Sequence, residues 1–190
     1  MRDAKQMTIG GMNVVTSGDA EIGRTAAVRA RLGLALELID ETTPRLGARM
    51  RHDLNAIYLA RNGGIGYNPY VRVINLDVRS GMQGEVEDLA LCLVHEATHA
   101  RQAAMGVAKK PNGKLEARME AHAVAESIAF ANRLPPGTWH RPTVADLDTK
   151  WWTWENRSTR ITEAMREANL PGLGVVMWII RTLRMLRLVR

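Results

Sequence analysis

Two histidines and a glutamate near the middle of the chain have the types and spacing of a metal site that activates water. Residues 93–99 read LVHEATH and contain an H-E-x-x-H motif. Residues four apart lie on one face of a helix, so His95 and His99 can present two imidazole nitrogens to one ion. Zn²⁺ accepts neutral imidazole, and Glu96 is placed to take a proton from water without binding the metal. The motif predicts a zinc site with a general base beside it.

A third protein ligand has to come from another element, because a catalytic zinc is commonly held by three side chains and one open position. We favour Glu120, which lies 21 residues after His99 and leaves room for a loop and an antiparallel helix. The alanines around Glu120 would let two helices approach closely. Glu116, one turn earlier on the same face, is the alternative ligand, and His122 is a weaker one.

Hydrolysis also requires a group that stabilises the oxyanion formed when water adds to a carbonyl. The tyrosines and histidines that could do so are Tyr58, Tyr67, Tyr70, His122 and His140. Tyr67 and Tyr70 are slightly favoured, because they flank a predicted strand that enters the site. Gln102 follows His99 by three residues, so it either hydrogen-bonds to a ligand or makes an ordinary contact on the helix surface.

Helical periodicity and strand-like runs alternate along the chain. The expected helices cover residues 20–40, 44–53, 85–105, 115–134 and 144–168. The expected strands cover residues 56–59 and 71–78, joined by a loop that holds Tyr67 and Tyr70. These segments predict a helix-rich α+β fold with a small antiparallel sheet.

Composition places the chain among globular proteins with one main domain. It has 190 residues, of which 46% are hydrophobic, and its single cysteine cannot form an internal disulfide. Its first residues contain no apolar run of signal-peptide length, so we expect a cytoplasmic protein. The net charge is +6, but residues 173–190 hold four arginines and no acid, which leaves 22 basic and 20 acidic residues elsewhere.

This basic tail is predicted to be an amphipathic helix, separate from a metal-binding domain at residues 1–172. Only 13 uncharged residues lie between Glu167 and Arg181, too few to span a bilayer. We expect the tail to pack on the domain, with peripheral contact at the inner face of the membrane as the second expectation. Binding to nucleic acid is not expected, since basic residues are not spread over the rest of the chain.

The chain resembles the zincin metallopeptidase superfamily, in particular its glutamate-ligand branch. The resemblance rests on LVHEATHARQ at residues 93–102 and ARMEAHAVAESIAFANRLP at residues 117–135, and it covers about residues 55–136. Within the superfamily, the chain is most similar to small bacterial H-E-x-x-H proteins. The resemblance implies a zincin-like domain with zinc at His95, His99 and Glu120 and with Glu96 as general base, but it implies no substrate.

Two further expectations follow from this resemblance. By analogy, the strand at residues 71–78 would offer its edge to an extended peptide. Glutamate-ligand enzymes often place an aspartate four residues after the ligand glutamate, where it orients the first histidine. This chain has Val124 at that position, so the groups that orient the ligands must differ.

The sequence therefore predicts a zinc-dependent hydrolase, a metallopeptidase that acts on a peptide or protein substrate. The alternative is a non-catalytic metal-binding module whose basic C-terminal helix contacts a membrane surface or nucleic acid.

Overall fold

The structure is a computed structural model that describes residues 5–16, 22–60, 65–78, 80–107 and 113–135. These residues form an α+β fold, as the sequence predicted. The helices are α1 (Ile22–Thr42), α2 (Pro44–Asp53), α3 (Val86–Ala104) and α4 (Gly113–Ala131), with a short 3-10 helix at Ser80–Met82. The strands are β1 (Lys5–Ile9), β2 (Met12–Thr16), β3 (Ala56–Ala60), β4 (Ile65–Asn68) and β5 (Val73–Asp77).

The sheet is mixed, so the prediction of a small antiparallel sheet was wrong. Its five strands follow the order β1-β2-β3-β5-β4, with antiparallel pairs at the two ends and parallel pairs in the middle. The parallel β2–β3 pair is explained by the connection between them, because α1 and α2 form a helical crossover that returns the chain to the same end of the sheet.

The first two strands were missed because they are short and because a polar, glycine-containing start has a weak strand signal. Gly10 and Gly11 form the turn between them, with φ of +53° and +71°. Residues with side chains rarely adopt these angles, so the two glycines make the tight hairpin possible.

The site-facing edge of the sheet also differs from the prediction. β5 lies between β3 and β4, so the segment at residues 71–78 has no free edge. The edge strand is β4, which contains Tyr67, a residue that we expected in a loop. The order of strands depends on pairing between distant segments, which local periodicity does not encode.

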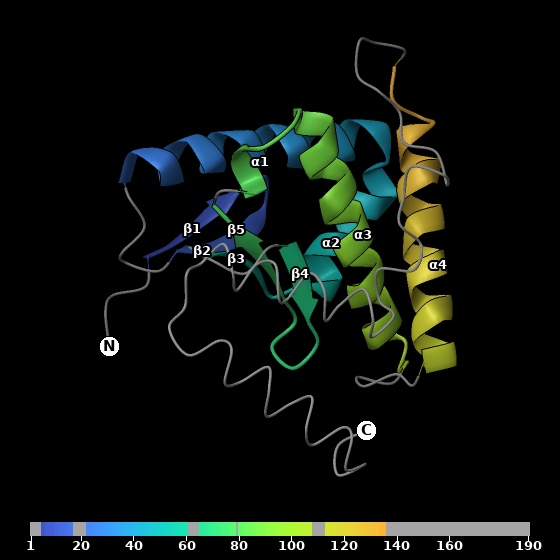
Figure 1. Ribbon diagram of the computed structural model, residues 1–190. Helices are drawn as coiled ribbons and strands as arrows, with labels where there is room; N and C mark the ends of the chain where they lie inside the picture. Colours follow the sequence, from blue (N-terminus) through green and yellow to red (C-terminus); the bar gives the residue numbers. More distant parts are fainter. Residues whose placement is uncertain (1–4, 17–21, 61–64, 79, 108–112, 136–190) are drawn as a thin grey trace, which may run out of the picture. The chain divides into compact units, whose positions relative to one another are not determined.

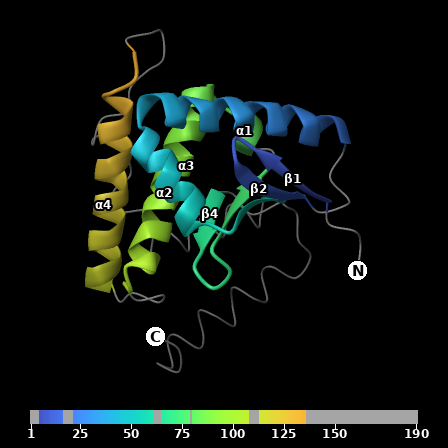
Figure 2. The same cartoon turned by 180° about the vertical axis from the view of Figure 1, so that it is seen from behind.

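One face of the sheet packs against the helices. The register places Val14, Ile57 and Ile74 side by side on this face, and all three are fully buried. They belong to one core cluster with Leu32 of α1 and Leu93 of α3. α1 lies across the sheet, while α3 and α4 run side by side in opposite directions (Figures 1 and 2).

Several sequence predictions concern residues that the structure does not describe. They include the helix expected at residues 144–168, His140, the division at residue 172 and the basic helix at residues 173–190. Within the described ranges, every helix is too short or too polar to cross a bilayer.

We predict that Gly10→Ala lowers the free energy of unfolding by about 1–2 kcal/mol, because alanine is strained at positive φ. A Cβ atom there would also lie 3.0 Å from Cβ of Leu36 in α1. Urea denaturation followed by circular dichroism measures the change.

Gly33→Ala is the matched control, because Gly33 lies inside α1 and an added Cβ would make an ordinary 3.5 Å contact with Ile9. This substitution should raise stability by about 0.5–1 kcal/mol, the helix preference for alanine over glycine. Equal effects of the two substitutions would contradict the hairpin geometry.

Candidate metal centre

Helix α3 carries the H-E-x-x-H motif and is held by a capping interaction at its start and by packing along its length. At its start, the backbone N–H of Glu85 donates to Asp88 Oδ2 at 2.7 Å, which fixes the first turn. Buried residues along α3 join the core, and α3 contacts α4 along much of its length. The helix is therefore held rigidly while one of its faces presents His95 and His99 towards α4.

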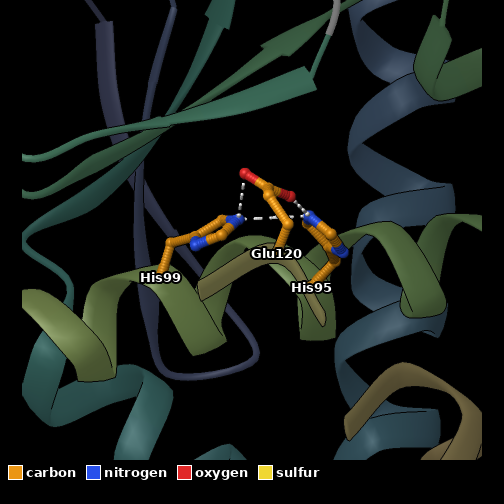
Figure 3. Close-up of side chains that lie close together, drawn as sticks. All are labelled: His95, His99 and Glu120. Carbon is orange, nitrogen blue, oxygen red and sulfur yellow. Dashed lines mark hydrogen bonds and ion pairs between the residues drawn. The ribbon is translucent and has the colours of Figure 1, made fainter. Parts of the chain in front are cut away.

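Glu120 of α4 meets these two histidines. Figure 3 shows the carboxylate and both imidazoles turned towards one point. His95 Nε2 lies 3.2 Å from His99 Nε2, and the Glu120 oxygens lie 3.3 Å from His95 Nε2 and 3.4 Å from His99 Nε2. Ligands about 2.0–2.1 Å from a tetrahedral zinc stand roughly 3.3 Å apart. One Glu120 oxygen faces each imidazole, and one ligand atom from each of the three residues lies within 4.8 Å of the other two, so the group is compact enough to hold a metal ion.

Gln102 determines which His99 nitrogen is free to bind a metal. Its Nε2 donates to the carbonyl oxygen of Met119 at 3.0 Å, and a carbonyl can only accept. The amide oxygen of Gln102 is therefore the atom that lies 2.9 Å from His99 Nδ1. Nδ1 of neutral His99 must carry the proton, so the lone pair of Nε2 points at the Glu120 carboxylate.

The carboxylate and the imidazoles of the cluster favour a positive charge between their ligand atoms. Burial by itself would raise the pKa of Glu120, but the two imidazoles outweigh it and lower the pKa to about 2. Burial by itself would lower the pKa of His99, but the Glu120 carboxylate raises it above its ordinary value. The raised pKa of His99 favours a proton there, and a bound cation would compete with that proton.

The burial of the Glu120 carboxylate also supports a bound cation at this site. Glu120 Oε2 is buried, and besides its 3.3 Å contact with His95 Nε2, which is a hydrogen bond only when that nitrogen carries a proton, it makes no hydrogen bond in the described part of the chain. An unsatisfied buried carboxylate oxygen is costly, and coordination to a cation would satisfy it. The donor set of two imidazoles and one carboxylate suits zinc and other first-row divalent ions. His95, His99 and Glu120 therefore form a group that could bind a metal ion.

Glu96 lies beside this group but points to the sheet. The backbone N–H of Tyr67 donates to Glu96 Oε2 at 2.7 Å. Tyr67 is in the edge strand β4, and this N–H faces away from β5. Burial raises the pKa of Glu96 despite the opposing effects of the nearby imidazoles and of the Tyr67 N–H. A higher pKa makes a carboxylate a stronger base.

The structure brings together the residues that the sequence favoured. Of the acidic candidates in α4, Glu120 joins the two histidines and Glu116 does not. His122, proposed as a weaker ligand or an oxyanion group, instead lies with Nδ1 3.2 Å from Gln102 Nε2. Gln102 makes the ligand contact that we considered, whereas Val124 is buried and apolar.

The tyrosine predictions have a different outcome. Tyr67 contributes its backbone N–H to the site, a role that no residue-type pattern reveals. Its side chain packs against the core from the helix-facing side of the sheet. Tyr70 is 61% exposed, and its backbone N–H donates to the side chain of Asn68.

Comparisons with known proteins add no relative. No protein family, curated protein or solved structure matches this chain. The assignment of a function therefore depends on the geometry of this site.

We predict that the purified chain binds about one zinc ion, and that His99→Ala and Glu120→Ala each abolish retention after dialysis, because two remaining ligands hold zinc weakly. Mass spectrometry of metal content makes the measurement. Glu116→Ala is the matched control and should retain the metal. If Glu116→Ala loses the zinc and Glu120→Ala retains it, the third ligand is Glu116.

We also predict that Gln102→Leu weakens zinc binding about 10- to 100-fold, the usual cost of losing a group that orients a ligand histidine. Competition with a chromophoric chelator gives the affinity. Gln102→Glu should lose less zinc affinity than Gln102→Leu, because its carboxylate still accepts a hydrogen bond from His99 Nδ1. Gln83→Leu, at an exposed glutamine before α3, is the control. Unchanged zinc affinity in Gln102→Leu would make Gln102 a purely structural contact.

Proposed function

We propose that this protein is a zinc-dependent hydrolase of the zincin type, and specifically a metallopeptidase. The observation that carries the proposal is the convergence of His95, His99 and Glu120 at 3.2–3.4 Å, with Glu96 next in sequence to the first of them. The resemblance of residues 93–102 and 117–135 to the glutamate-ligand zincins supports the same function.

The residues of the chain have distinct tasks in this proposal. Zinc, when bound, would supply a Lewis acid that activates water and polarises a substrate carbonyl. Glu96 takes the proton from the attacking water and passes it to the leaving amine. Gln102 keeps His99 in the tautomer that leaves Nε2 free. Burial of the Glu96 carboxylate favours proton uptake by raising its pKa.

The peptide would bind along β4. An edge strand offers backbone groups that pair with an extended peptide of almost any sequence. The N–H of Tyr67 in β4 points out of the sheet, and this donor is occupied by Glu96. A substrate carbonyl that accepts from Tyr67 N–H would displace the Glu96 carboxylate, so the base becomes free when a peptide is in place.

We predict that Glu96→Gln lowers the rate of peptide cleavage by about 10²- to 10⁴-fold, the range for loss of a general base. A set of internally quenched fluorescent peptides, assayed with the zinc-loaded protein, gives the rate. Zinc content should stay unchanged, because Glu96 is not one of the three ligands.

The matched control is Glu116→Gln, which removes the same charge from a glutamate outside the cluster. It should cleave at the rate of the parent protein. Equal rates for Glu96→Gln and the parent would contradict the peptidase proposal and favour a non-catalytic metal-binding module.

A further inference from the structure

A cavity of about 990 Å³ opens between the start of α2 and the second half of α4. None of its lining residues belongs to the metal cluster. The described residues that line it are Thr42, Thr43, Pro44, Arg45, Leu46, Ala48, Arg49, Glu126, Ala129, Phe130 and Arg133. Its volume is in the range of sites that hold small organic molecules.

Three arginines with exposed side chains, Arg45, Arg49 and Arg133, line this cavity. Within the described part of the chain, their guanidinium groups make no hydrogen bond or ion pair. One carboxylate, Glu126, is present, and it lies 3.8 Å from His122 Nε2. The ionisable side chains among the described lining residues thus have a formal charge of +2.

The placement of this charge is unfavourable for α2 itself. Arg45 lies in the first turn, where the helix dipole favours acidic residues and where α2 has none. Arg45 and Arg49 are four residues apart, the spacing at which like charges repel on a helix. The Thr43 hydroxyl donates to the carbonyl of Ile39 instead of capping α2. A bound anion would offset all three effects.

Beside the arginines, Thr42 and Thr43 add hydroxyl groups to the described lining. Its accessible apolar part comes from Pro44, Ala48 and Ala129, because Leu46 and Phe130 are buried. A bare inorganic anion would leave this part of the cavity unused. A ligand with an anionic group and an aromatic or aliphatic body would contact both parts.

We propose that this cavity binds a small organic phosphate, a phosphomonoester with an apolar body. Such a group carries close to two negative charges at pH 7, which matches the charge of the lining. Guanidinium groups bind phosphate oxygens through paired, charge-assisted hydrogen bonds. This site is independent of the proposed peptidase function.

Isothermal titration of the full chain with phenyl phosphate and with inorganic phosphate tests the proposal. Phenyl phosphate should bind about tenfold more tightly than inorganic phosphate, because only its ring contacts the apolar lining. Arg49→Gln and Arg133→Gln should each weaken the binding of phenyl phosphate about 10- to 100-fold, because each variant loses a charge-assisted hydrogen bond.

Arg118→Gln is the matched control, since Arg118 is an exposed arginine of α4 outside the cavity. It should bind phenyl phosphate like the parent protein, and all three variants should keep their metal content and far-ultraviolet circular dichroism. The amide resonances of residues 45, 46, 129 and 130 should shift in the parent protein on addition of phenyl phosphate.

Three results would overturn the proposal. The first is no binding of phenyl phosphate at millimolar concentration. The second is an equal loss of binding in Arg118→Gln, which would indicate non-specific attraction to a basic protein. The third is equal affinity for phenyl phosphate and inorganic phosphate, which would show that the cavity does not recognise the organic part of the ligand.

Discussion

The close approach of α3 and α4 is the constraint on which the candidate site depends. A glutamate on one helix must reach two histidines on the other, and its carboxylate must stay within 3.4 Å of both imidazoles. In α4, the fully buried Ala123 lies three residues after Glu120 on the same face of the helix, where its small side chain permits this approach. The cluster that results has a carboxylate and imidazole lone pairs facing one another, an arrangement that a cation or a proton among them would stabilise.

The sheet contacts Glu96, next to the metal cluster, through the backbone N–H of Tyr67. Because β4 is an edge strand, one of its outward N–H groups is available to Glu96 of α3. The strand order is therefore part of the site: with β5 at the edge, as first expected, a different backbone segment would face the helix. This contact joins the helices to the sheet at Glu96, the residue to which the proposed function assigns the general base.

Local sequence patterns predicted the described helices well, but they did not predict the pairing of strands that are distant in the sequence. Helices α2, α3 and α4 were expected within a few residues of their bounds, because their apolar periodicity and their breakers are local signals. Glu120 could be favoured over Glu116 from spacing, but only the packing of α4 on α3 distinguishes their positions. The hairpin β1–β2, the strand β4 and the N–H of Tyr67 had no comparable signal, since sheet order and backbone donors leave little trace in residue type.

The hydrogen bond from Gln102 to the carbonyl of Met119 has a mechanical consequence for the helix pair. A screw displacement of α4 by one residue would turn Glu120 by about 100° and move it about 1.5 Å along the axis, away from both imidazoles. Met119 immediately precedes Glu120, so this hydrogen bond opposes sliding at the place where sliding would do most harm. The side chain that sets the tautomer of His99 thus also sets the register of two helices.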